Sequence, residues 1–196
     1  MFVQIIQGHV GDAALLDAQA RRWSAEIKPG ATGFLGSTRG ITDDGTGVAV
    51  VRFESEAAAA ANSARPEQAA WWEQTAAAYD GEVSFLDCRD VDVMLDGGSD
   101  RAGFVQLISA RTRDKEALRA MGASAEDSLR ASRPDVLGGI IAWHDDDAFV
   151  QVVYFTSEDD ARKGEAAMSD DSSAPDWASM MDGAPTFLDL RSPEFD

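Results

Sequence analysis

One short run of residues occurs twice in this chain, and the distance between the copies constrains the fold more than any other feature. Phe85–Arg89 reads FLDCR and Phe187–Arg191 reads FLDLR, an offset of 187 − 85 = 102 positions. The same offset relates FVQII at Phe2 to FVQLI at Phe104 without a gap. Further pairs keep it: Asp12 with Asp114, Leu16 with Leu118, Phe53 with Phe155, and Asp80-Gly81 with Asp182-Gly183. One offset held over a whole domain indicates a tandem duplication.

Each repeat carries the same order of secondary-structure signals. In the first, an apolar β-rich run from Phe2 precedes Asp12, which suits the N-cap of an amphipathic helix. Two β-rich runs then flank Asp44-Gly45, a dipeptide typical of tight hairpins. Ser55 suits a second cap, and Pro66 suits the first turn of a third helix before a last strand. The predicted order is β-α-β-β-α-β, the ferredoxin-like plan.

A ferredoxin-like repeat covers one face of its sheet with helices and leaves the other face bare. Two repeats can bury their bare faces against each other. We therefore predict an α+β fold in which two ferredoxin-like repeats pack sheet to sheet as one pseudo-dimeric α+β barrel within the chain. The predicted boundaries are 1–95 for the first repeat, 96–101 for a linker reading DGGSDR, and 102–196 for the second repeat.

Charge and composition narrow the partners. The formal net charge is −18, from 17 basic and 35 acidic residues, and such a field repels phosphate backbones and anionic membranes. We therefore expect no nucleic-acid and no membrane partner. No run approaches the roughly 18 apolar residues of a membrane helix, and the first residues do not resemble a signal peptide, so a cytoplasmic location is expected. The single cysteine, Cys88, is predicted to be a buried small apolar side chain.

The run HDDD at His144–Asp147 could suggest a metal site. Its counterpart in the first repeat is the hairpin run TDDG, so a turn is the favoured interpretation. A metal would need converging ligands with further support around them, and the sequence does not require one. We predict no metal and no bound cofactor.

Gly33–Gly36, Phe53–Glu56, and Pro66 with the helix after it carry a resemblance to a known family. The second repeat keeps Leu137-Gly138 and Phe155–Glu158. On these residues the chain resembles the dimeric α+β barrel superfamily, in particular antibiotic-biosynthesis-monooxygenase-like domains. The resemblance implies a barrel closed within one chain and a small-ligand pocket between each sheet and its own helices. It implies activities such as cofactor-free oxidation of aromatic polyketides to quinones, or haem degradation.

The resemblance does not extend to the functional residues of well-studied members. Quinone-forming oxygenases of the family place Asn, Trp and Tyr where this chain has Ala49, Phe53 and Ala59. The second repeat has Gln151, Phe155 and Ala161 at those places. Haem-degrading members place Asn and His where this chain has Ile6 and Trp71. Neither constellation is present.

Four residues of the first repeat are predicted to line a ligand pocket: Trp23, Asn62, Trp72 and Tyr79. Trp and Tyr combine a flat apolar body with a polar handle, and core packing is the alternative role for each. Two functions stay open. One is cofactor-independent oxidation of a small aromatic substrate by a monooxygenase-like protein. The other is a non-catalytic protein that binds a small apolar ligand or acts as a scaffold. Further self-association of the barrel is also left open.

Asp and Arg recur two residues apart on the last strand of both repeats. The residues are Asp87, Arg89, Asp189 and Arg191. Side chains two apart on a strand share a face, so each pair is placed to form ion pairs. Because both repeats keep these residues, we interpret them as a structural ion-pair network that could bridge the barrel, rather than as a catalytic group.

Overall fold

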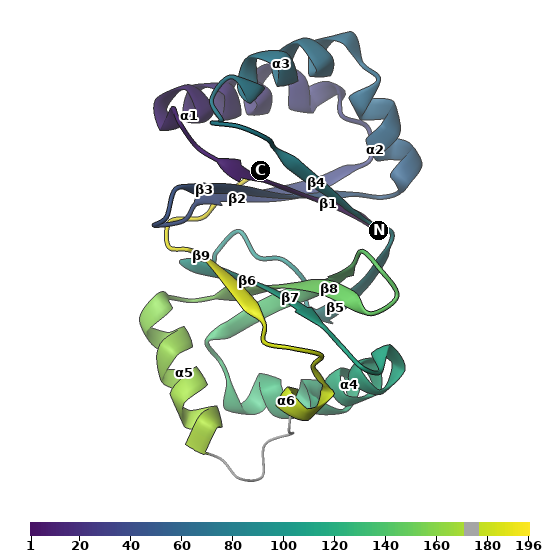
Figure 1. The fold of residues 1–196 in the computed structure, drawn as a ribbon, viewed down its shortest axis with the longest axis vertical. Coiled ribbons are helices and arrows are strands. Elements are labelled where there is room, and N and C mark those ends of the chain that lie inside the picture. The colour runs from purple at the N-terminus through teal and green to yellow at the C-terminus, as the bar shows by residue number, and fades with distance from the viewer. Residues whose placement is uncertain (171–176) are drawn as a thin grey trace. The chain divides into compact units, whose positions relative to one another are not determined.

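The computed structural model describes residues 1–170 and 177–196, which form two compact units. Unit 1 comprises residues 1–89 with 194–196, and unit 2 comprises residues 90–193. Each unit is one five-stranded antiparallel sheet with helices over one of its faces (Figure 1). The predicted α+β class with two ferredoxin-like repeats is confirmed. That the bare sheet faces bury each other stays a prediction. No helix of the described residues is long and apolar enough to cross a membrane.

Unit 1 has the strand order β10-β2-β3-β1-β4. Its elements are β1 (Phe2–His9), α1 (Ala13–Arg22), β2 (Phe34–Ile41), β3 (Thr46–Phe53), α2 (Glu56–Ser63), α3 (Pro66–Ala76), β4 (Ser84–Cys88) and β10 (Glu194–Phe195). A π-helical turn at Trp23–Ile27 and a 3-10 turn at Lys28–Gly30 extend α1.

Unit 2 repeats this arrangement, with the strand order β5-β7-β8-β6-β9. Its elements are β5 (Asp90–Leu95), β6 (Phe104–Arg111), α4 (Lys115–Ser132), β7 (Val136–Trp143), β8 (Ala148–Phe155), α5 (Glu158–Asp170), α6 (Trp177–Met180) and β9 (Thr186–Leu190).

The predicted helix starts are confirmed by their caps. The Asp12 carboxylate accepts a hydrogen bond from the Leu15 amide at 2.9 Å, and the Ser55 hydroxyl accepts one from Ala58 at 3.1 Å. Pro66 is the first residue of α3, where its missing N–H costs nothing. Each cap satisfies an amide that the helix itself leaves unpaired and contributes about 1 kcal/mol.

The fifth strand of each sheet comes from the opposite repeat. β5 ends the first repeat and pairs with β7 of unit 2, while β10 ends the second repeat and pairs with β2 of unit 1. The two pairings have the same register. Val93 lies opposite Ile140, and the residues equivalent to them in the other repeat, Phe195 and Thr38, also lie opposite each other. The compact units therefore differ from the sequence repeats 1–95 and 102–196. Residues 96–101, predicted as a linker, form the loop between β5 and β6 inside unit 2.

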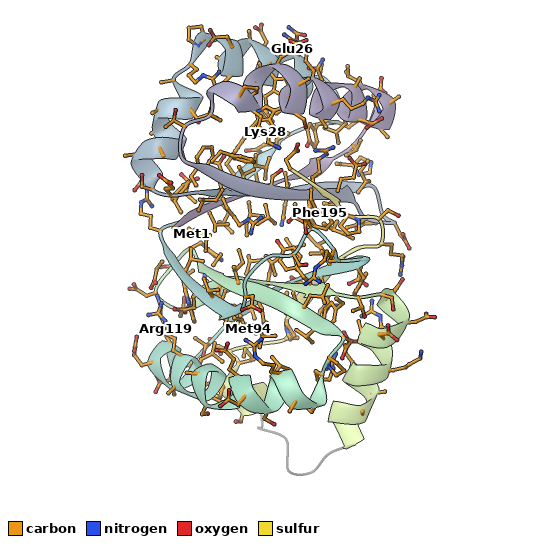
Figure 2. All side chains as sticks on the ribbon, turned by 180° about the vertical axis from the view of Figure 1, so that it is seen from behind. Met1, Glu26, Lys28, Met94, Arg119 and Phe195 are labelled. Carbon is orange, nitrogen blue, oxygen red and sulfur yellow. The ribbon has the colours of Figure 1, made fainter. Side chains whose placement is uncertain are left out.

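A buried carboxylate holds β10 in place. The Asp196 side chain is 7% exposed, and Arg39 Nη1 donates a hydrogen bond to it at 2.6 Å. The Ser24 hydroxyl also donates to it, and Lys28 Nζ lies 3.6 Å away (Figure 2 labels Lys28). The Glu194 carboxylate pairs with the same arginine from a more exposed position. Polar side chains from α1's extension and from β2 thus compensate for the shortness of β10.

Charged side chains of α4 hold β5 in the same way. Arg119 donates to Asp90 at 2.6 Å and to Asp92 at 2.8 Å, and the Trp143 indole donates to Asp92 at 2.7 Å. Figure 2 labels Arg119. The hydrogen bond from Lys115 is the largest cause of the lowered pKa of Asp90. In both units, ion pairs therefore stabilise the strand that comes from the opposite repeat, an arrangement called strand exchange below.

The Asp196 carboxylate is expected to contribute more to stability than its neighbour Glu194. Asp196→Ala removes a buried acceptor of charged hydrogen bonds and should lower the free energy of unfolding by about 2 kcal/mol. Glu194→Ala removes a pair with an exposed carboxylate and should cost less than about 1 kcal/mol. Urea unfolding of both variants measures the difference, and equal losses would contradict this role of Asp196.

Cys88 is fully buried, as predicted, and its thiol should be unreactive in the folded protein. Burial, with the nearby Asp87 charge, raises the pKa of Cys88 to about 12. An exposed thiol with a pKa near 8.5 forms thiolate readily at a pH of about 8, whereas Cys88 should not. We expect a disulfide reagent to label the protein in guanidinium chloride and leave the native protein unlabelled.

The same measurement tests the packing of the bare sheet faces. Phe85 contacts Trp72 of α3 and therefore lies on the helix-covered face of β4. Cys88, three residues further along the strand, points to the opposite face. Rapid labelling of native Cys88 would contradict both its burial and the prediction that this face is covered.

Candidate functional site

Seven aromatic rings in unit 1 form one continuous series of contacts, called here the aromatic chain. Neighbouring ring centroids lie between 4.9 and 6.4 Å apart, in edge-on or tilted arrangements. Such geometries are favourable because the edge of one ring faces the electron-rich face of the next. In order of contact the members are Phe53, Phe34, Trp23, Trp71 and Trp72, the last of which contacts both Tyr79 and Phe85.

One end of the aromatic chain lies in the hydrophobic core of unit 1. Trp23 is 8% exposed and packs with Ile27, Ala31 and Phe34. Its indole N–H donates to Gln68 Oε1 at 3.0 Å, and the Trp71 indole donates to the backbone carbonyl of Gln19 at 2.8 Å. Both polar handles are satisfied inside the protein. Trp23 therefore packs against other rings in the core, and ligand binding by Trp23 stays a prediction.

The other end of the aromatic chain is open to solvent. Trp72 and Tyr79 are half-buried, and Phe85 is 47% exposed. Among the described residues, neither the Trp72 indole N–H nor the Tyr79 hydroxyl has a hydrogen-bond partner. We call these three residues the open aromatic end. It offers flat apolar surface together with two unused polar groups.

Two glycines let the Tyr79 ring lie directly on the sheet. A Cβ at Gly8 would lie 2.8 Å from Tyr79 Cδ1, and one at Gly47 would lie 3.2 Å from Cε1. A backbone bridge between Val10 and Tyr79, with Asp80 N donating to the His9 carbonyl at 2.8 Å, fixes the segment after α3. Burial raises the pKa of Tyr79, so its hydroxyl stays protonated at neutral pH.

The sheet beneath the helices is partly exposed at its centre. Ile6 pairs with Phe85 in register, so it shares the face that the helices cover. Ile6, its partner Ala49 and the neighbouring Val51 are half-buried although they lie on central strands. The helices therefore do not close completely over this face. The open aromatic end adjoins an apolar floor that a flat ligand could contact.

Asn62, the fourth residue predicted to bind a ligand, makes its contacts away from the aromatic chain. Its side chain is buried, and its Oδ1 accepts a hydrogen bond from Arg65 at 3.0 Å. Arg65 also donates to the Ile27 carbonyl at 3.1 Å. Asn62 thus fixes an arginine that joins α2 to the end of α1's extension. No ring contact or hydrogen bond joins it to the aromatic chain among the described residues.

The predicted ion-pair residues make contacts within each unit. Arg89 binds Glu56 through two hydrogen bonds of 2.8 and 2.6 Å, and its counterpart Arg191 binds Glu158 at 2.7 Å. Both glutamates begin a helix, so each pair joins a strand end to a helix start. The Arg89 hydrogen bond lowers the pKa of Glu56.

Asp87 and Asp189 are bound by glutamines of the neighbouring strand. Gln4 Nε2 donates to Asp87 at 2.7 Å, and Gln106 Nε2 donates to Asp189 at 2.9 Å. Arg162 of α5 also binds Asp189. Bridging of the barrel by these residues stays a prediction.

Among the described residues, the equivalent region of unit 2 has no continuous series of rings, because its ring contacts are the separate pairs Phe104–Phe155 and Trp143–Phe149. Ala125 stands where unit 1 has Trp23, and Met121 stands where it has Gln19. Around the same sheet face, Met94, Ile108 and Leu129 pack against the buried cluster. The candidate site is therefore a property of unit 1 alone among the described side chains.

His144 lies in the turn between β7 and β8, so the predicted turn is confirmed. Burial lowers the pKa of His144, which keeps the imidazole neutral at neutral pH. Within residues 1–170 and 177–196, no three His, Cys, Asp or Glu side chains converge as a metal site would require.

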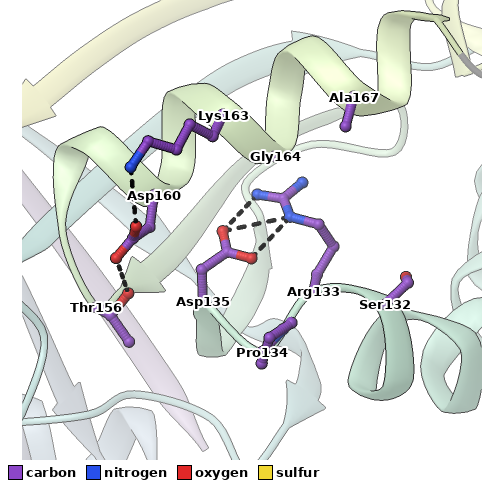
Figure 3. A pocket seen from close by; sticks show the side chains of 9 residues that line it. All are labelled: Ser132, Arg133, Pro134, Asp135, Thr156, Asp160, Lys163, Gly164 and Ala167. Carbon is purple, nitrogen blue, oxygen red and sulfur yellow. Dashed lines mark hydrogen bonds and ion pairs between the residues drawn. The ribbon is translucent and has the colours of Figure 1, made fainter.

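A groove of about 500 Å³ in unit 2 lies between the end of α4 and α5. Its charged groups are paired with each other: Arg133 with Asp135 at 2.7 Å, and Lys163 with Asp160 at 3.6 Å (Figure 3). Gly164 gives Arg133 room, since a Cβ there would lie 2.2 Å from the guanidinium carbon. The groove therefore presents neutralised charge and no aromatic surface. No motif in the sequence indicates this groove.

Comparison with known proteins identifies the fold. No protein-family model matches the chain, and no curated protein does. Among solved structures, a proposed monooxygenase from Fusobacterium nucleatum has a TM-score of 0.74 at 10% identity, covering 100% of this chain and 93% of its own. One from Lactobacillus acidophilus has a TM-score of 0.72 at 12% identity, covering 98% and 95%. An anthrone oxidase-like protein has a TM-score of 0.58 at 11% identity, covering 100% and 92%. The chain thus has the dimeric α+β barrel fold, with both halves in one polypeptide.

Proposed function

We propose that unit 1 binds a flat, electron-rich aromatic molecule at the open aromatic end and oxidises it with molecular oxygen. The observation that carries the proposal is the pair of unused polar groups, the Trp72 indole N–H and the Tyr79 hydroxyl, beside the exposed ring of Phe85. The names of the structural relatives, proposed monooxygenases and an anthrone oxidase-like protein, support the same class of substrate.

The proposed reaction converts an anthrone-type methylene to a carbonyl. The substrate loses a proton, and the resulting anion passes an electron to oxygen. One oxygen atom then enters the product, and the other leaves as water with the two methylene hydrogens. The protein binds the rings against Trp72 and Phe85, while Tyr79 donates a hydrogen bond to the anion. No protein-bound cofactor takes part in the proposed reaction.

We assign the Asp87 carboxylate to take the substrate proton, in place of the structural role that the sequence favoured, because Gln4 is its one hydrogen-bond partner among the described residues, whereas its counterpart Asp189 is also bound by Arg162. Asp87 lies two residues from Phe85 on β4, so the two side chains share the helix-covered face of the sheet. Gln4 holds one of its oxygens at 2.7 Å, which orients the carboxylate. A positioned general base of this kind contributes typically 10²–10⁴-fold to a rate.

Phe85 and Phe187 provide a matched pair of variants for binding. They occupy the same strand position in the two repeats and are 47% and 54% exposed, but only Phe85 adjoins the aromatic chain. Phe85→Ala should weaken binding of anthrone by roughly tenfold, through lost stacking and buried area. Phe187→Ala should leave it unchanged. Equilibrium dialysis of both variants measures this, and equal effects would place the ligand elsewhere.

The Asp87→Asn variant tests the oxidation step separately from anthrone binding. With an oxygen electrode and anthrone as substrate, we expect the wild-type protein to consume oxygen faster than buffer alone. We expect the Asp87→Asn rate to fall at least about 100-fold, with anthrone binding retained. Oxygen uptake no faster with protein than without it would overturn the oxidation proposal.

A non-catalytic binding role is the second candidate. It is favoured by Ala49 and Phe53, which stand where quinone-forming relatives carry functional side chains, and by the position of Phe53 in the buried end of the aromatic chain. In that case anthrone binds and Phe85→Ala weakens binding, but oxygen consumption stays at the level of buffer.

A further inference from the structure

Gln19 is a buried polar residue without a complete set of partners. The residue is 9% exposed, and it is the buried residue of α1. Its carbonyl oxygen, Oε1, is fully buried and accepts no hydrogen bond from any described residue. Buried polar atoms in native proteins are nearly always paired, so the exception calls for an explanation.

The fold itself does not require a polar side chain at this position. The second repeat has Met121 at the equivalent place, where its side chain packs against the apolar cluster of unit 2. An unsatisfied buried acceptor destabilises a protein, whereas an apolar side chain of similar length does not. Gln19 therefore carries a stability cost that unit 2 avoids.

The position of Gln19 connects it to the aromatic chain. Its backbone carbonyl accepts the Trp71 indole hydrogen bond at 2.8 Å, and Trp71 contacts Trp72 at a centroid distance of 6.0 Å. Trp23 lies one helical turn further on and shares the face of the helix with Gln19. The backbone of Gln19 thus lies beside the middle of the aromatic chain, and its side chain shares a helix face with Trp23.

We propose that Gln19 Oε1 accepts a hydrogen bond from a hydroxyl group of the aromatic ligand, so that the site selects phenols over aromatics without a donor. This inference rests on the proposed aromatic-binding function. A carbonyl oxygen can only accept, so a hydroxylated ring satisfies it while the corresponding methyl ether cannot. A site built to pair a ligand hydroxyl discriminates strongly against the analogue that lacks it.

The test compares 1-naphthol with 1-methoxynaphthalene by equilibrium dialysis. We expect the wild-type protein to bind the naphthol about tenfold more tightly, the ratio that one net hydrogen bond supplies. Gln19→Met, which copies Met121, should reduce the ratio to within about twofold by weakening naphthol binding alone. Gln74→Met, at an exposed position of α3, is the control and should keep the wild-type ratio. Gln19→Leu serves in its place if Gln19→Met does not fold.

A second readout does not involve a ligand. Because Gln19→Met removes an unsatisfied buried acceptor, its melting temperature without ligand should equal or exceed that of the wild-type protein. A marked drop would show that the amide is already paired in the free protein and would overturn the inference.

The outcomes separate the inference from the function on which it rests. Binding of neither compound to the wild-type protein would overturn both. Equal binding of both compounds by the wild-type protein would keep the aromatic site and overturn the role of Gln19. A tenfold preference that persists in Gln19→Met would assign the hydroxyl to another acceptor and would also overturn it.

Discussion

The unpaired backbone of a sheet edge is the constraint on which this structure depends. An exposed edge offers N–H and C=O groups to any other strand, so proteins pair or protect it. Here β2 and β7 would be edges, and each is paired by a strand from the opposite repeat. β10 is short, but the buried Asp196 carboxylate that follows it forms ion pairs with Lys28 of α1's extension and Arg39 of β2. Neither repeat can complete its own sheet alone, which explains why the chain contains two.

The two units share a backbone plan but differ in the chemistry between sheet and helices. At equivalent positions, unit 1 has Asp196, Gln19 and Trp23, where unit 2 has Met94, Met121 and Ala125. Polar and aromatic side chains are costly choices for a core, because their polar atoms need partners. Aliphatic side chains and methionine fill space without that requirement. The candidate binding chemistry is therefore concentrated in unit 1.

Much of the fold could be predicted from the sequence, because the repeat and the caps are local signals. Asp12, Ser55 and Pro66 mark helix starts wherever the chain goes next, and Asp44-Gly45 marks a turn. The strand exchange could not be predicted, since pairing of Phe195 with Thr38 depends on contacts between distant segments. Within the predicted site, the rings of Trp72 and Tyr79 contact each other, while ligand binding by them stays a prediction. The burial of Asn62 could not be predicted from the sequence, because it depends on the hydrogen bond from Arg65.

Strand exchange also has a consequence for the order in which the chain can fold. Glu194 and Arg39 are 155 positions apart, so unit 1 lacks its fifth strand until almost the whole of unit 2 has been synthesised. Closing so long a loop is entropically unfavourable, and contacts of this range are associated with slow folding. In a nascent chain, the edge of β2 therefore stays exposed until β10 is synthesised. β5 likewise stays unpaired until β7 is synthesised. Ribosome-bound chains of this protein should be most prone to strand-mediated misassembly during that interval.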